Sequence, residues 1–228
     1  MKYMFIWNNK NSDSMGLWIT QMPEPTRAPE RFETVEIPGR AGSLILLEGD
    51  DVYDNYTKEI IVQTLRSNPR MQEIMDWLRG SGELILSNER NFSYKARIAA
   101  KVQFDRVNNV LMQAVIPFIV EPFKCSRYPD GDRITVASSG ETIKNPGNVA
   151  SKPIISVTGS TSITINSKTI PVSNDSGTVV IDCEAHVATK GGEIYGDIDD
   201  FWTLPVGDST ITYTGTPTIV IDPNWRWV

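Results

Sequence analysis

The sequence predicts a mainly β protein, with an α+β N-terminal part that holds one short helix and a C-terminal antiparallel β-sandwich. Short segments of alternating apolar and polar residues recur along the chain, which is the period of a half-buried strand. Threonine, a β-branched residue that packs well on a pleated sheet, rises from 5 in residues 1–124 to 14 in residues 125–228. An apolar stripe at helical spacing stands out near residue 70.

The composition is that of a globular protein with two domains. The 228 residues are 40% hydrophobic and 22% charged, and a chain of this length buries roughly 70% of its surface on folding. Residues 1–124 carry 15 basic and 16 acidic side chains, and residues 125–228 carry 7 and 12, for a net charge of −6. This shift predicts domains at 1–125 and 126–228. The acidic balance argues against a protein that works by neutralising nucleic-acid phosphates.

The N-terminal domain is expected to hold several strands around one helix. Asn68 is a suitable N-cap, Pro69 fits the first helical position and Gly80 follows the last apolar residue, which predicts a helix over 69–79. Its core-facing stripe is Met71, Ile74, Met75 and Leu78. The predicted strands are 44–48, 58–65, 96–104 and 110–120.

The C-terminal domain is predicted to be a series of short strands. Turns recur at intervals of roughly eight to twelve residues, which is the spacing typical of a β-sandwich. The predicted strands are 154–157, 162–165, 178–182, 210–214 and 218–221. Residues 123–132 contain Pro129 and the turn dipeptide Asp130-Gly131, so this segment is expected to be a short connection after Pro117 and Pro122.

No signal peptide is expected at the start of the sequence. The apolar run that begins at Met1 ends at Asn8, which is too short for a signal-peptide core, and the chain has no apolar run approaching the ~20 residues that cross a bilayer. A soluble protein made in the cytoplasm, without membrane insertion, is therefore expected. Cys125 and Cys183 are too few for a disulfide scaffold and are expected to be reduced.

The single histidine, His186, lies three residues after Cys183 and invites a catalytic cysteine–histidine pair. On one extended strand, residues three apart point to opposite faces, so the pair could not form a hydrogen bond without a turn. We therefore expect Cys183 to be a small buried hydrophobe and His186 a surface residue. A thiol-dependent or carboxylate-dependent hydrolase remains the enzyme alternative.

Two acidic clusters supply oxygen ligands of the kind that Ca²⁺ prefers, but neither has the spacing of an EF-hand, and solvated loops are the favoured interpretation. The clusters are Glu48, Asp50, Asp51 and Asp54, and Asp197, Asp199 and Asp200. The glycines that bracket Arg40, namely Gly39 and Gly42, lack the Lys-Ser/Thr ending of a phosphate-binding loop and predict a tight turn instead. No catalytic residue, metal or cofactor is predicted.

Aromatic residues give the C-terminal domain a second candidate site. Trp202 and Tyr195 could form a stacking platform for a sugar, whereas the same residue types also serve a core or a subunit interface. Trp225 and Trp227 add to this aromatic content. Core or interface is the favoured interpretation, and a carbohydrate-binding sandwich used in host-surface recognition is the alternative function.

Several stretches resemble one family, the distal tail proteins (Dit) of long-tailed, non-contractile phages and prophages. Residues 29–44 end in Ile37-Pro38-Gly39-Arg40-Ala41-Gly42-Ser43-Leu44, similar to an I-P-G-R-x-G-x-L pattern of that family. An acidic loop at 50–56, the strand 58–65, the helix and the strand 82–86 follow in the family's order. In the second half, residues 145–159, 163–166, 180–183 and 200–208 resemble the family's C-terminal domain.

The resemblance implies a structural virion protein without catalysis, located in the baseplate or tip at the distal end of the tail and assembled in the host cytoplasm. It implies an N-terminal belt domain that forms a six-membered ring, with a galectin-like sandwich at the periphery. Such a ring connects the tail tube protein to the tail-associated fibre or lysin protein and, in some relatives, to receptor-binding proteins. Galectin-like here describes a fold and not sugar binding.

Overall fold

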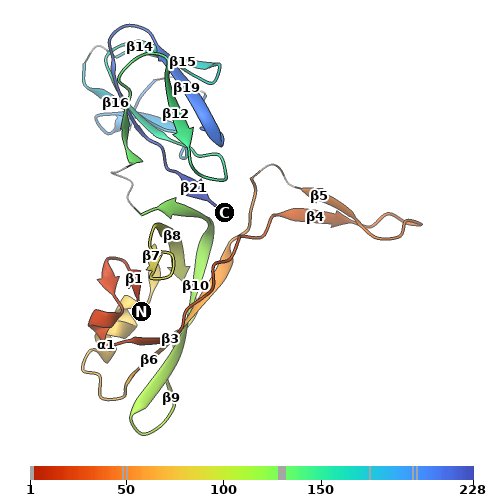
Figure 1. The fold of residues 1–228 in the computed structure, drawn as a ribbon, viewed down its shortest axis with the longest axis vertical. Helices are drawn as coiled ribbons and strands as arrows, with labels where there is room; N and C mark the ends of the chain where they lie inside the picture. Colours follow the sequence, from red (N-terminus) through yellow and green to blue (C-terminus); the bar gives the residue numbers. More distant parts are fainter. Residues whose placement is uncertain are drawn as a thin grey trace. The chain divides into compact units, whose positions relative to one another are not determined.

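The computed structural model describes residues 3–47, 49, 51–127, 132–174, 176–196, 198 and 200–228 (Figure 1). The chain divides into two compact units, of which unit 1 ends at Arg127 and unit 2 follows it. Strands dominate both units, and the regular helices described are α1 (Met71–Trp77) and the single-turn η1 (Asp13–Met15). The prediction of a mainly β chain is confirmed. Among the described residues, no helix is long and apolar enough to cross a membrane.

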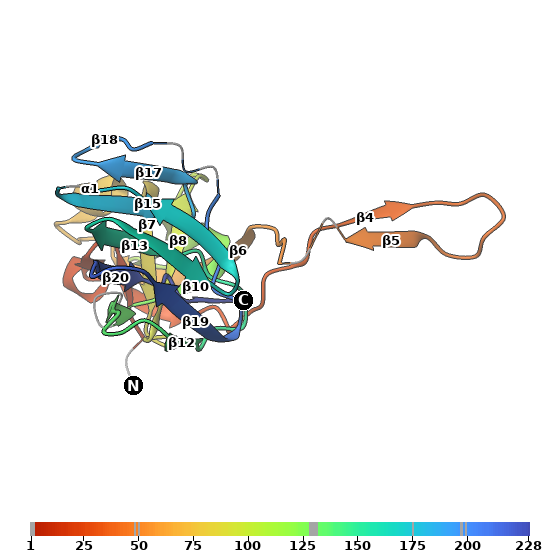
Figure 2. The same ribbon diagram turned by 90° about the horizontal axis from the view of Figure 1, so that it is seen from above.

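Unit 1 is built on one curled antiparallel sheet with the strand order β2-β1-β7-β8-β10-β6-β3, and β9 pairs with β10. A separate pair, β4 and β5, extends away from this sheet (Figures 1 and 2). The strands are β1 (Phe5–Trp7), β2 (Lys10–Asn11), β3 (Trp18–Gln21), β4 (Phe32–Val35), β5 (Leu44–Leu47), β6 (Tyr56–Leu65), β7 (Gly80–Leu86), β8 (Phe92–Ile98), β9 (Asp105–Arg106) and β10 (Leu111–Ser126).

Aromatic residues at the centre of unit 1 fix α1 against the sheet. The indole of Trp7 donates to the carbonyl of Trp77 at 3.1 Å, and the indole of Trp77 donates back to the carbonyl of Trp7 at 2.9 Å. Phe5 stacks on Trp77 with ring centres 5.5 Å apart, and Phe118 of β10 meets Phe5 and Trp7 edge to face. Such pairs stabilise a core beyond the area that they bury.

The helix is present but begins later and faces differently from the prediction. It starts at Met71 and not at Pro69. The Asn68 side chain accepts from the Arg70 amide at 2.9 Å, which is the bond of an N-capping or Asx-turn residue, and its amide group donates to the Met15 carbonyl. Ile74 and Leu78 are buried as expected, whereas Met75 is exposed. Trp77 takes the place that Met75 was expected to fill, because its indole bonds to β1.

Two strand predictions in unit 1 are wrong in extent. The strand expected over 96–104 ends at Ile98, and the later apolar residues Val102 and Phe104 pack on the core without a strand partner. The strand expected over 110–120 continues to Ser126, so the first four residues of the connection expected over 123–132 belong to β10. The pairing of β10 with β8 shifts between Val120 and Lys124, so Pro122, which has no amide proton to donate, lies at an irregularity of the ladder.

Unit 2 is a β-sandwich of two antiparallel sheets, with strand orders β11-β20-β13-β16-β17-β18 and β12-β19-β14-β15. Side chains from both sheets form one core cluster, which includes Ile155, Ile181 and Ile221 of the first sheet and Ile163 and Ile211 of the second. The strands are β11 (Ile134–Thr135), β12 (Glu141–Asn145), β13 (Ile154–Thr158), β14 (Thr161–Ile165), β15 (Lys168–Val172), β16 (Thr178–Asp182), β17 (Val187–Lys190), β18 (Glu193–Ile194), β19 (Gly207–Tyr213) and β20 (Thr218–Asp222). The short strand β21 (Arg226–Trp227) follows them in the chain and belongs to neither sheet of the sandwich.

Candidate assembly surface

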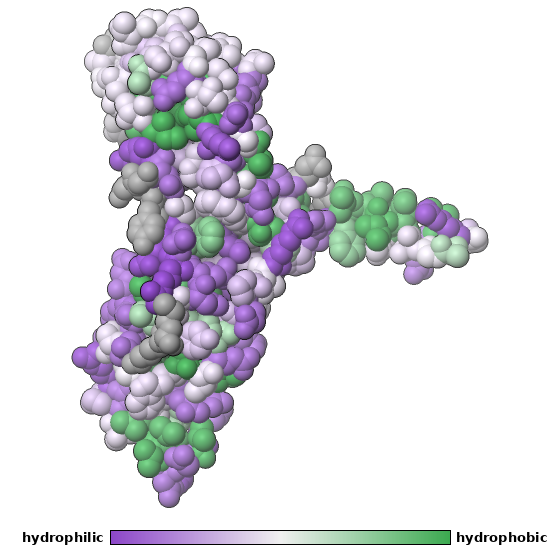
Figure 3. Space-filling view, viewed as in Figure 1, coloured by the Kyte–Doolittle hydropathy of each residue, from purple (hydrophilic) through white to green (hydrophobic). Residues whose placement is uncertain are grey.

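The pair β4–β5, hereafter the arm, is the most exposed apolar feature of unit 1. Its register pairs Phe32 with Leu47 and Thr34 with Ile45, which places these four side chains on one face, because directly opposed residues share a face. Phe32 is 54% exposed, and Ile45 and Leu47 are each 61% exposed. Figure 3 shows the resulting apolar surface along the arm.

The opposite face of the arm is also apolar. Val35 pairs with Leu44 there, and Leu46 lies opposite Glu33. Val35 and Leu46 are exposed as well. An isolated two-stranded hairpin is marginally stable in water, and exposed apolar surface of this kind marks an interaction site in a soluble protein. The arm therefore has two faces that a partner can cover.

The tip of the arm is the tight turn that the sequence predicted. Gly39 and Gly42 have φ angles of 83° and 78°, in the left-handed region that glycine enters without a steric penalty. The amide of Arg40 donates to the carbonyl of Ile37 at 3.1 Å. The prediction that these glycines supply positive φ is confirmed, and the motif that resembles the phage family forms the arm and its turn.

Hydrogen bonds and ion pairs join the two chain segments where the arm leaves the body of unit 1. The amide of Arg31 donates to the carbonyl of Val52 at 3.0 Å, and the amide of Asp54 donates to the carbonyl of Pro29 at 2.9 Å. The side chains of Arg31 and Asp54 form an ion pair at 2.7 Å. Asp54, which was counted in the first acidic cluster, is thus partnered by an arginine.

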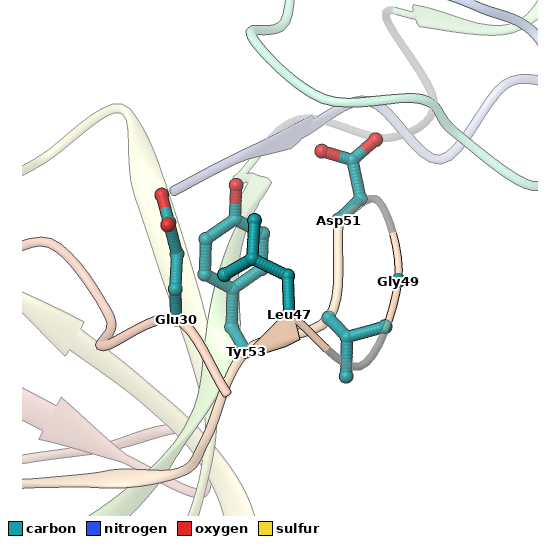
Figure 4. Close-up of a pocket in the computed structure, with 6 residues that line it drawn as sticks. Glu30, Leu47, Gly49, Asp51 and Tyr53 are labelled. Atoms are coloured by element: carbon teal, nitrogen blue, oxygen red, sulfur yellow. The ribbon is translucent and has the colours of Figure 1, made fainter. Parts of the chain in front are cut away.

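A shallow hollow of about 320 Å³ lies beside this junction. Figure 4 shows its labelled residues, with the Tyr53 ring between the carboxylates of Glu30 and Asp51 and with Leu47 of the arm in front. Glu48 and Asp50 of the acidic cluster lie outside the described residues. No group of three His, Cys, Asp or Glu side chains within the described ranges has the geometry to hold a metal ion.

A buried charge cluster lies in the body of unit 1. The carboxylate of Glu89 accepts from the Tyr94 hydroxyl at 2.6 Å and faces the ammonium groups of Lys124 at 3.1 Å and Lys58 at 3.4 Å. The Lys58 ammonium also lies over the Tyr94 ring, 5.1 Å from its centre. Nothing in the residue pattern indicated this cluster, because its members come from β6, β8, β10 and the turn between β7 and β8.

Burial and charge shift the pKa values of this cluster in different directions. Burial raises the pKa of Glu89, but the Tyr94 hydrogen bond and the two lysine charges outweigh it, so the pKa of that carboxyl lies below its ordinary value. Burial lowers the pKa of Lys58 in spite of the Glu89 charge. Burial is also the main cause that raises the pKa of Tyr56 to about 12, with the charge of Glu89 second.

Cys183 and His186 of unit 2 do not have the environments expected of a catalytic pair. Cys183 follows the end of β16 and is buried, and burial raises the pKa of its thiol to about 11, which opposes formation of a nucleophilic thiolate. His186 lies in the turn after β16, is exposed and stacks on Phe201 at 5.1 Å. The expected burial of Cys183 and exposure of His186 are confirmed, although the two residues lie in a turn and not on one strand.

Trp202, the main residue of the proposed sugar-stacking platform, is part of the core. Trp202 is 1% exposed, and its indole donates to the carbonyl of Lys168 at 2.9 Å. Tyr195 is half-buried, and its hydroxyl donates to the carbonyl of Ser173. Trp225 is buried, and Trp227 packs partly buried against the same cluster. Of the second acidic cluster, Asp197 and Asp199 lie outside the described residues, and Asp200 forms an ion pair with Lys168.

Replacement of Trp202 tests this assignment to the core. Trp202→Ala is expected to lower the free energy of unfolding of unit 2 by about 3–5 kcal/mol, because it leaves a large cavity and removes the indole hydrogen bond. His186→Ala, at an exposed position, is the matched control and is expected to change it by less than about 0.5 kcal/mol. Chemical denaturation measures both. Equal stabilities of the two variants would contradict the assignment.

Comparisons of sequence and of structure differ in what they find. No family model matches the sequence, and no curated protein matches it significantly. Among solved structures, one match is titled "Crystal Structure of SPP1 Dit (gp 19.1) Protein, a Paradigm of Hub Adsorption Apparatus in Gram-positive Infecting Phages", with a TM-score of 0.75 and 12% identity. It covers 97% of this chain and 98% of that chain. The chain therefore shares the fold of SPP1 Dit over nearly its whole length, in agreement with the family resemblance of the sequence.

Proposed function

We propose that this chain is a structural hub component of a phage adsorption apparatus, located at the distal end of the tail. The observation that carries the proposal is the fold, which matches that of a phage hub protein over 97% of this chain and 98% of that chain. The burial of Cys183 and Trp202 supports a structural protein over an enzyme or a sugar-binding module, because the residues that those alternatives need are part of the core.

Six copies form a ring in this proposal, and the arm joins neighbouring copies. A closed ring needs two unlike, complementary patches on each protomer. The arm supplies one of them: its apolar side chains are exposed on both faces, so that it gains stability when it lies against another molecule. Unit 1 is then the ring-forming domain, and unit 2 is a galectin-like sandwich at the periphery.

The partners of such a ring are the tail tube protein on one side and the tail-associated fibre or lysin protein on the other. Receptor-binding proteins join the same assembly in some systems. The net charge of −6 for each chain is unfavourable for binding the genome through phosphate neutralisation, so no nucleic-acid partner is proposed.

Electron microscopy of labelled virions tests the proposed location. An antibody against unit 2 is expected to decorate particles that carry this chain at the tail end distal to the capsid. Pre-adsorption of the antibody with purified unfolded chain and with an unrelated sandwich protein provides the controls. Label elsewhere on the particle, or purified virions that lack the chain, would contradict a role in the adsorption apparatus.

A further inference from the structure

The segment that leads into the arm, residues 23–30, has no regular strand before its bridge at Glu30. Its carbonyl groups are held instead by three side chains from the body of unit 1. The Asn88 amide donates to the Pro23 carbonyl at 2.9 Å, the Lys58 ammonium to the Glu24 carbonyl at 3.3 Å and the Tyr56 hydroxyl to the Thr26 carbonyl at 3.3 Å. We call this segment the arm root, and the three donors Tyr56, Lys58 and Asn88 the root clamp.

Lys58 is the unexpected member of the root clamp. Its side chain is 1% exposed, and a buried ammonium loses so much hydration that lysine is almost never found in such a place without a partner. Glu89 is only part of the explanation, because the ammonium has three N–H donors and the bond to this carboxylate, at 3.4 Å, uses one of them. Lys58 also donates to the Glu24 carbonyl of the arm root. That carbonyl accepts from the Thr26 hydroxyl as well, at 2.9 Å, but Thr26 belongs to the arm root itself, so Lys58 is the donor that joins this carbonyl to the body of unit 1.

We propose that Lys58 is a positioning residue for the arm, and that the root clamp holds the arm in one direction before any partner binds. This rests on the proposed function in one respect, namely that the arm joins neighbouring copies. An arm fixed at its root loses less conformational freedom when it docks, which strengthens binding without any new contact. The bond from Lys58 differs from the other two in that its donor is charged and buried, so its loss also removes a charge from the interior.

Residues of the arm root allow a direct test. Trypsin cleaves after arginine, and Arg27 and Arg31 lie within and immediately after the root. Cleavage under native conditions requires local opening, so its rate reports how firmly the root is held. Lys58→Met keeps an apolar stem of similar length and removes the donor, and cleavage at Arg27 and Arg31 is expected to become about tenfold faster, as for a lost charged hydrogen bond.

Ile116→Val is the matched control. Ile116 lies on β10 in the core and is fully buried, so the substitution weakens unit 1 without removing a donor to the arm root. The cleavage rate of Ile116→Val at Arg27 and Arg31 is expected to equal that of the unmodified chain. If Lys58→Met does not fold, Tyr56→Phe and Asn88→Ala each remove one donor from the clamp, and each is expected to raise the rate a few-fold.

Cleavage rates test the root clamp, and assembly measurements test the ring, so the two proposals can fail independently. Lys58→Met is also expected to need about tenfold more protein to assemble, measured by mass photometry across a dilution series, because a released arm must be ordered on docking. Cleavage rates that are equal in Lys58→Met and the unmodified chain, or raised equally in Ile116→Val, would overturn the clamp whether or not rings form. An unmodified chain that forms no ring, but whose cleavage rates follow the order above, would contradict the proposed function and leave the clamp standing.

Discussion

Replacing Ile45 and Leu47 of the arm with aspartate is expected to abolish ring formation and leave a monomer of 25.5 kDa. Burying an exposed aliphatic side chain contributes about 1.5–3 kcal/mol, and a buried carboxylate without a partner costs more than that. In an assembly with several identical interfaces, this loss is repeated at each one. Folding of the single chain should change little, because both side chains are largely exposed in it.

A matched substitution outside the arm controls for surface charge. Ile194 is 83% exposed and Val206 is also exposed, both in unit 2. The double variant Ile194→Asp with Val206→Asp adds the same two charges and is expected to assemble as the unmodified chain does. Sedimentation velocity of the two double variants at equal concentration makes the comparison. Rings in the arm variant, or loss of rings in both variants alike, would contradict the role given to the arm.

Glu89→Gln is expected to lower the free energy of unfolding of unit 1 by about 3–5 kcal/mol at neutral pH, because it leaves two ammonium groups in the interior without their counter-charge. Unit 2 should keep its stability, since Glu89 makes no contact in its core. Amide hydrogen exchange followed by mass spectrometry resolves the two units and measures both values. Lys124→Met, which removes one cation and leaves Glu89 paired with Lys58, is expected to be milder.

The loss of stability caused by Glu89→Gln should become smaller as the pH falls. The pKa of Glu89 is below its ordinary value of 4.5 in the folded chain, so its ionised form contributes stability that is complete above that value. The contribution is lost as the pH falls through the lower pKa of the folded state. The stability difference between the unmodified chain and Glu89→Gln should therefore shrink as the pH is lowered below 4.5. A difference that stays constant under acid would contradict the ionised cluster.

The pattern of the sequence predicted five strands of unit 2 and missed others, among them β12, β15 and β17. In unit 2 the strand expected over 178–182 is β16, and the four other predicted strands match their counterparts to within three residues at each end. These strands bury alternate side chains in a sandwich, which is the condition that the period of two describes. The turn at Gly39 and Gly42 was predicted for a similar reason, since local backbone geometry determines it.

The same pattern failed to predict what depends on contacts between distant segments. The arm strand β5 is an unbroken apolar run, Leu44–Leu47, and composition cannot distinguish a side chain that packs inside the chain from one that packs on another molecule. Lys58, Glu89 and Lys124 lie far apart in sequence and meet through the pairing of β6, β10 and β8. The favoured interpretation of Trp202, core or interface, is confirmed as core, but the sequence pattern could not choose between those two.

The central claim is that copies of this chain close into a ring, and the mass of the purified full-length protein together with negative-stain images tests it most directly. A closed ring of six chains of 25.5 kDa would have a mass of about 153 kDa and six-fold symmetry in class averages. Dilution should dissociate it, because the arm contacts are reversible. A particle that remains a monomer of 25.5 kDa at every concentration up to that of assembled tails would contradict the claim.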